Sequence, residues 1–220
     1  MRLRRKASTE DGVLEDEAGG TTGESGPHSD DASRAHGPWD ASELVVDAED
    51  ETRVHLGALN VKGHDGIEVR LQVDEASQQV AGVMLVAADG AMELRPFAAA
   101  RHEDLWPSVR QAISAEAARH GGTASEVDVA YGRGLELRVP GTGPDGRTVT
   151  QVSTVMGIAG PRWMLRVTMF GRPATDYRED GLLEQALRDV VVDRGTEAMP
   201  PGEALPLSLP AGARRVDGPA

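Results

Sequence analysis

Residues 139–150 read VPGTGPDGRTVT, and the interpretation of this stretch decides the fold class. Gly141, Gly143 and Gly146 spell the G-x-G-x-x-G pattern of dinucleotide-binding α/β proteins. That pattern holds a pyrophosphate only where the glycines follow a parallel strand and open a helix. Here the next residues, RTVTQVST, are rich in β-branched side chains, and Asp145-Gly146 is a tight-turn pair. The stretch therefore predicts a hairpin between antiparallel strands and no nucleotide site.

Residues on both sides of this hairpin alternate with period two. In residues 67–73, apolar Ile, Val and Leu side chains alternate with Glu, Arg and Gln, which is typical of a half-buried strand. The sequence predicts a first meander of strands at 67–73, 80–87 and 91–97, and a second at 127–131, 135–139, 148–158 and 163–171. Leu165 and Val167 are expected in the core, with Arg166 and Thr168 on the other side of the strand or at the rim of the helix-covered layer.

Two segments have helical periodicity instead. Leu105, Val109 and Ile113 form one apolar stripe, and a second stripe runs from residue 183 to residue 191 before Gly195. Because a helix of this length is marginal in water, each stripe must pack on another element. We expect an α+β fold, with antiparallel meanders and two helices packed on the sheet rather than on each other.

The N-terminal residues differ from the rest in charge and pattern. Residues 1–53 hold 14 acidic and 6 basic side chains, a net charge of −8 out of −13 for the whole chain. Residues 1–36 also lack apolar periodicity, so they cannot bury enough surface to offset their ordering entropy. We expect a disordered acidic tail at 1–36, a single globular domain at 37–210 with an N-terminal anchor segment around Trp39, and a flexible end at 211–220.

The acidic balance and the absence of cysteine limit the function classes. A sequence pI near 4.9 disfavours direct nucleic-acid binding, which needs a cationic surface. A chain without cysteine has no disulfide, thiolate or cysteine-based metal chemistry. Acidic residues follow MRLRRK where a signal peptide would be apolar, and no run approaches the roughly 20 apolar residues of a membrane span. We expect a soluble cytoplasmic protein without a membrane partner.

No pattern points to catalysis or to a cofactor. The six histidines include no i,i+4 pair with a third metal ligand nearby. The acidic pairs at 74–75, 103–104 and 179–180 fall in turns or helix starts, and no serine lies in a G-x-S-x-G elbow. We therefore assign no catalytic residue, no metal ligand and no cofactor.

Four arginines form the remaining pattern, because each alternates with core residues on a predicted strand. They are Arg70, Arg95, Arg138 and Arg166. One interpretation is a solvated outer face, with cross-strand pairs to Glu68, Glu93 and Glu136. The other is a surface for an acidic ligand or a protein partner.

Blocks of the sequence resemble a known family. They include GPWDASE at 37–43, GIEVRLQVDEASQQVAGVMLV at 66–86, GPRWMLRVTMFGRPA at 160–174 and LRDVVVDRGTEAMPPGEALPLSLP at 187–210. In this order they resemble an actinobacterial family catalogued as domain of unknown function 3710. The resemblance implies a cytoplasmic actinobacterial protein and brings no activity, cofactor or site residue. The order of elements is also similar to the Mog1/PsbP-like α/β sandwich, a fold that mostly serves binding and accessory roles.

Three functional hypotheses follow. The leading one is a non-enzymatic binding or accessory module whose sheet surface or ends engage a protein partner. The alternatives are an enzyme with a cleft of Asp, Glu, His and Arg that the sequence does not locate, and a regulator of nucleic-acid metabolism acting through another protein. A convergent pocket of titratable groups would favour the enzyme, and a broad groove would favour the binding module.

Overall fold

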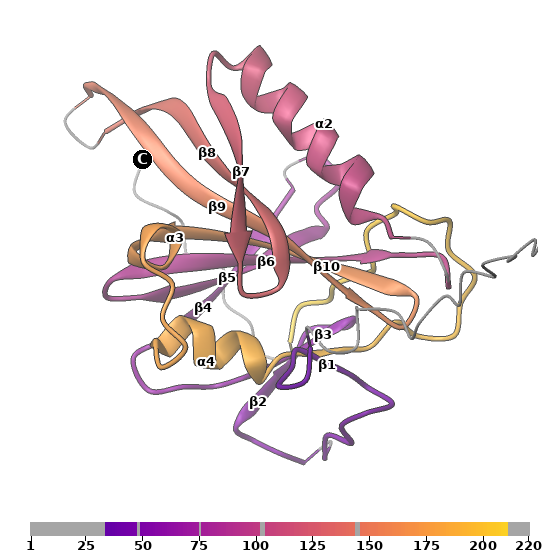
Figure 1. The fold of residues 1–220 in the computed structure, drawn as a ribbon. Coiled ribbons are helices and arrows are strands. Elements are labelled where there is room, and N and C mark those ends of the chain that lie inside the picture. The colour runs from indigo at the N-terminus through magenta and orange to yellow at the C-terminus, as the bar shows by residue number, and fades with distance from the viewer. Residues whose placement is uncertain (1–33, 48, 75, 102–103, 144–145, 211–220) are drawn as a thin grey trace, which may run out of the picture.

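A computed structural model describes residues 34–210, except residues 48, 75, 102–103 and 144–145. The predicted tail, apart from its last three residues, and the predicted flexible end at 211–220 lie outside the described residues. Figure 1 shows a large sheet with the helix α2 on one face and with α4 and a small sheet on the other. The α+β class with antiparallel sheets and packed helices is confirmed.

Within the described residues, seven strands form the large sheet in the spatial order β4-β5-β6-β10-β9-β8-β7. They are β4 (Glu68–Val73), β5 (Val80–Ala87), β6 (Gly90–Ala98), β7 (Thr123–Val129), β8 (Gly132–Thr142), β9 (Thr148–Gly160) and β10 (Trp163–Gly171). All neighbours pair antiparallel. β6 pairs with β10 in the middle, so the two predicted meanders join into one sheet.

The glycine-rich stretch is the hairpin between β8 and β9. Thr142 pairs with Thr148, and the Gly143 N–H donates to the Arg147 carbonyl. Gly146 has a φ of +75°, a left-handed conformation that glycine adopts readily. The glycines lead into a strand, so the predicted hairpin is confirmed.

The hairpin between β7 and β8 turns earlier than predicted. Tyr131 was expected in the strand and residues 132–134 in the turn, but β7 ends at Val129 and β8 begins at Gly132. Gly132 takes the left-handed conformation with a φ of +105°. Gly134 lies within β8, where a Cβ would come within 2.9 Å of the Val129 side chain.

The helix α2 (Trp106–Arg119) packs on β7, β8 and β9. Its stripe of Leu105, Val109 and Ile113 faces the sheet as predicted. Trp106 lies over Gly157, where a Cβ would come within 2.5 Å of the indole ring. The missing side chain at Gly157 therefore lets the start of the helix approach β9 closely.

The main core lies on the opposite face of the large sheet. Trp163, Leu165, Val167 and Met169 of β10 all point into it and are 0% exposed. The predicted burial of Leu165 and Val167 on a central strand is therefore confirmed.

Within the described residues, four short strands form a small sheet over this core, in the order β1-β11-β3-β2. They are β1 (Trp39–Asp40), β2 (Arg53–His55), β3 (Leu59–Lys62) and β11 (Val191–Val192). Leu59, Val61 and Val192 are fully buried between the two sheets. The sequence does not predict this sheet, because strands of two to four residues are too short to show alternation.

The last predicted helix is shorter than expected. The stripe was expected to continue through Val190 and Val191, but α4 (Leu182–Arg188) ends before them and Val191 lies in β11. The three successive valines at 190–192 are β-branched, which favours the extended chain. Leu183 and Leu187 pack α4 against the core face, on the other side of the sheet from α2, so both helices do pack on the sheet. A further short helix, α3 (Arg172–Thr175), was not predicted.

The N-terminal end of the described chain is fixed beside β10. The Arg34 guanidinium lies 5.4 Å from the centroid of the Trp163 ring and donates to both Glu43 oxygens at 2.8 Å. The Trp163 indole N–H donates to the Asp40 carboxylate at 2.7 Å. These contacts hold the segment around Trp39 against the core.

Candidate functional site

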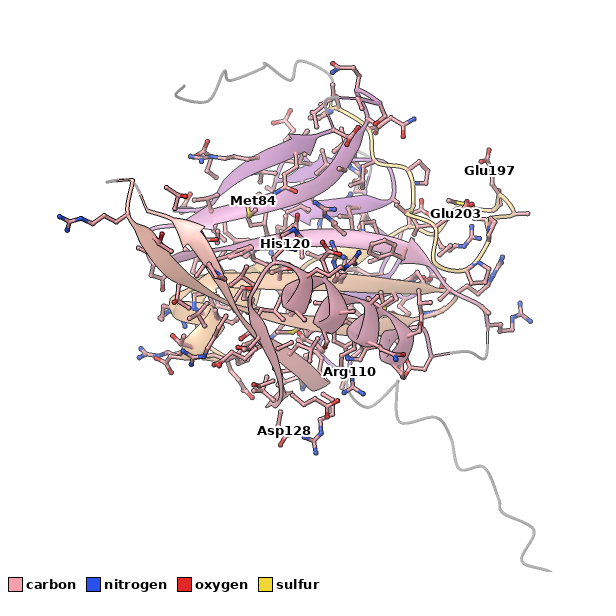
Figure 2. The ribbon with its side chains drawn as sticks, turned by 90° about the horizontal axis from the view of Figure 1, so that it is seen from above. Met84, Arg110, His120, Asp128, Glu197 and Glu203 are labelled. Carbon is pink, nitrogen blue, oxygen red and sulfur yellow. The ribbon has the colours of Figure 1, made fainter. Side chains whose placement is uncertain are left out.

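Part of the α2 side of the large sheet carries no helix. α2 lies over β7, β8 and β9, and its first residues also pack on Met164 of β10 and Phe97 of β6. Within the described residues, no helix covers the rest of this face on β4, β5, β6 and β10. Figure 2 looks down on this side and shows α2 beside the uncovered strands, with Met84 on the uncovered part. We call this surface the open face. The pairing register places on it Arg70, Gln72, Met84, Glu93, Arg95, Phe97, Arg166 and Thr168.

Three of the four predicted arginines share the open face. Arg95 and Arg166 lie directly opposite each other on β6 and β10, and Arg70 lies two strands away on β4. Arg138 lies on the other face of the sheet. Its strand, β8, presents Leu137 toward α2, and the next residue along a strand points the opposite way. The expectation of one shared face is therefore wrong for Arg138, because alternation alone does not say which face of a strand meets which neighbour.

Arg70 and Arg138 have carboxylate partners on their own strands. Arg70 Nη2 donates to Glu68 at 2.7 Å, and Arg138 Nε donates to Glu136 at 2.8 Å. The hydrogen bond from Arg70 lowers the pKa of Glu68. Glu68 and Glu136 are the glutamates that were expected as partners. Each lies two residues from its arginine on the same strand, and not on a neighbouring strand. These two arginines fit the interpretation of a solvated face.

Arg95 lies flat along the open face toward β4. Its guanidinium donates to Glu93 at 2.9 Å and to the Gln72 side-chain oxygen at 3.1 Å. Gly82 lies beneath it, and a Cβ at Gly82 would come within 3.2 Å of the Arg95 side chain. The glycine therefore leaves the space in which Arg95 lies, and Glu93, only 9% exposed, neutralises its charge.

Arg166 differs from the other three arginines. Its guanidinium lies 5.4 Å from the centroid of the Phe97 ring, and it has no hydrogen bond or ion pair within the described residues. Burial lowers the pKa of Arg166, and the neighbouring charge of Arg95 lowers it further, against the attraction of Glu93. Arginine nevertheless stays charged at physiological pH, so Arg166 presents a half-buried positive charge with free N–H donors.

The sequence pattern does not single out Gly82, Gln72 or Phe97 as site residues. Their importance comes from strand pairing, which places each of these residues next to an arginine that belongs to another strand. A lone glycine in a strand can mark a close approach of another group, and that is the one signal Gly82 offered.

A concavity of about 660 Å³ lies on the opposite face between the β7–β8 hairpin and α3. The pair of Arg138 and Glu136 lies in its wall, and the Thr154 hydroxyl donates to the Ala174 carbonyl at 2.6 Å. These three side chains are thus already bonded within the protein. The described residues include no group of three His, Asp or Glu side chains placed to hold a metal ion.

The open face can therefore provide hydrogen-bond donors for an anionic group, with apolar surface beside these donors.

Among the described residues, no helix combines the length and the apolar character that crossing a bilayer requires. No curated protein and no solved structure matches the chain, so the topological likeness to the Mog1/PsbP-like sandwich stays a prediction. One family model does match, over residues 37–215, and its description is protein of unknown function, DUF3710. With most of its length inside that match, the chain belongs to the DUF3710 family.

Proposed function

We propose that the protein is a binding module that holds a protein partner on the open face. The observation that carries the proposal is the uncovered surface of β4, β5, β6 and β10 beside α2. Exposure alone would be weak support, since antiparallel sheets often have one face in water. The composition of the face adds to it.

The open face has side chains that are typical of protein interfaces. The cores of such interfaces are enriched in arginine, methionine and aromatic residues. Arg95, Arg166, Met84 and Phe97 come together on this surface, all of them only partly exposed. A surface selected for solubility alone would carry lysine and glutamate at such positions. The alternative of a regulator of nucleic-acid metabolism acting through a protein would use the same surface, and the identity of the partner decides it.

The experiment compares what the full chain captures from cells of its own organism with what two variants capture. Met84→Lys places a charge on the open face, where a long side chain can reach water without disturbing the core. Val45→Lys is the matched control, because Val45 is 90% exposed and lies outside the sheets. We expect a specific partner to be retained by the wild type and by Val45→Lys and lost by Met84→Lys, with equal thermal midpoints.

Hydrogen exchange on the purified complex gives the second measurement. The partner should slow exchange in β4 and β5, where the open face borders solvent. Protection confined to the small sheet, or equal loss of the partner in both variants, would contradict the proposed function.

A further inference from the structure

Arg166 occupies a position that costs stability within the isolated protein. Its cross-strand neighbour is Arg95, and like charges directly opposite each other on a sheet are destabilising. Glu93 is already bonded to Arg95 and does not reach Arg166 within ion-pair distance. Sequences tend to keep such local conflicts where a site needs them.

The surroundings of Arg166 fix its guanidinium without using its donors. Phe97 supports the group from one side through a cation–π contact, and Trp106 covers the adjacent position of β9, Gly157. A fixed guanidinium loses little further freedom when it binds a planar oxyanion through two parallel hydrogen bonds. Partial burial also strengthens such a bond, because water screens it less.

The charge balance selects the kind of anion. Arg70 is neutralised by Glu68 and Arg95 by Glu93, which leaves Arg166 as the one unbalanced positive charge that the described residues place on the open face. One carboxylate balances one charge, whereas a phosphate ester carries close to two negative charges at neutral pH. Small molecules bind in concave sites, and a sheet surface instead suits a macromolecular ligand.

We propose that Arg166 is the receptor for an acidic side chain of a protein partner, with Arg95 as its positive neighbour and Phe97 as its support. The inference rests on the proposed function and names the chemistry of the partner. The acidic residue would be flanked by apolar side chains, since Phe97 lies beside Arg166 and Met84 lies opposite Arg70 on the same face.

The test uses the full ¹⁵N-labelled chain and two terminally capped peptides, Val-Leu-Glu-Leu-Val and Val-Leu-Gln-Leu-Val. The Nε–H resonance of Arg166 should shift and saturate with the glutamate peptide. Binding of the glutamine peptide should be at least about tenfold weaker, since a charge-assisted hydrogen bond is lost. Arg166→Gln should abolish binding, and Arg70→Gln, which removes an arginine of the same face, should leave it unchanged.

Thermal unfolding separates this role from a structural one. Arg166→Gln removes a like-charge contact, so its thermal midpoint should equal or exceed that of the wild type. A lower midpoint would mean that Arg166 is kept for its stacking on Phe97 and would overturn the proposal.

Other results would also overturn it. Equal binding of the two peptides, or equal loss in Arg166→Gln and Arg70→Gln, would exclude a specific carboxylate receptor. Tighter saturation by inorganic phosphate than by the glutamate peptide would assign the site to phosphate. Self-association that requires Arg166 would assign it to a second copy of this chain. Binding seen only after the acidic residues before Ser33 are changed to amides would assign it to the chain's own N-terminal segment.

The two proposals fail in distinguishable ways. If a captured partner depends on Met84 but is retained by Arg166→Gln, the proposed function stands and the carboxylate receptor is wrong. If the glutamate peptide binds at Arg166 but no captured partner depends on Met84, the proposed function is wrong, and Arg166 is a carboxylate site that does not serve a partner on the open face.

Discussion

Tyr131 and Tyr177, the two tyrosines of the chain, interact with each other at the edge of the main core. Burial raises the pKa of both phenols above the ordinary value of 10.0, although Arg188 opposes the shift. The two phenols ionise near pH 10 in the unfolded chain and at higher pH in the folded chain. The stability that comes from burying neutral phenols is therefore fully present below pH 10 and is lost as the pH rises through the folded-state pKa values. Every tyrosinate signal comes from these two side chains.

We therefore expect the folded protein to keep both phenols neutral at pH 10. Ultraviolet titration should show a midpoint above 10.0, followed by unfolding, and the chain in denaturant should titrate at the ordinary value. A folded protein with half of its tyrosine ionised at pH 10 would show that both phenols are in contact with water.

Leu165 tests the central strand at the level of one side chain. It is 0% exposed and lies in β10 between β6 and β9, so truncation leaves a cavity that the neighbouring strands cannot close. Leu165→Ala should reduce the free energy of unfolding in urea by about 2–5 kcal/mol. Leu209→Ala is the matched control, because Leu209 is 58% exposed and its truncation should change little. Similar costs for the two variants would place Leu165 outside the core.

The elements that the sequence predicts well are those with long runs of a single period. β4, β5, β6, β9 and β10 and the helix α2 all lie close to their predicted ranges. The small sheet could not be predicted, because β11 joins β1 and β3 through contacts between residues more than 100 positions apart. The same limit applies to the candidate site, since alternation identified its arginines and only the register separated Arg138 from Arg166.

The contact of Trp106 with Gly157 fixes α2 on the sheet. A Cβ at residue 157 would come within 2.5 Å of the indole ring, so the helix start must move. Gly157→Ala should therefore destabilise the protein by about 1–3 kcal/mol, the usual cost of overpacking. Trp106→Ala alone should also destabilise it, through the cavity it leaves.

The double variant measures the coupling between these two residues. Once the indole is absent, a methyl group at residue 157 meets open space, so the combined cost should be smaller than the sum of the single costs. Additive costs in urea unfolding would mean that the two side chains do not compete for the same volume.

The two faces of the large sheet differ in how completely other elements cover them. The core face is covered by the small sheet and α4, and the opposite face is covered by α2 only in part. Met164 and Phe97 already pack against the start of α2. A partner could contact the rest of the open face without displacing any described helix. The proposed partner would not touch the core face, so contacts within the protein must hold the elements of that face together.

Arg172 provides much of that connection. Its guanidinium bonds both oxygens of Glu184 in α4 at 3.0 Å and also pairs with Asp89, in the turn between β5 and β6. Glu184 is 0% exposed, and the Arg178 backbone N–H is its other donor at 3.1 Å. One side chain thus links the strand turn, α3 and α4.

Arg172→Met should reduce the free energy of unfolding by about 3–5 kcal/mol, because it leaves the buried Glu184 carboxylate without its main partner. The matched control is Arg178→Met, which breaks an exposed pair with Asp176 and should change the free energy of unfolding little. Adding Glu184→Leu to Arg172→Met removes the unpaired charge and should restore part of the stability. If the double variant is no more stable than Arg172→Met in urea, the cost comes from the lost link to Asp89 and not from the buried carboxylate.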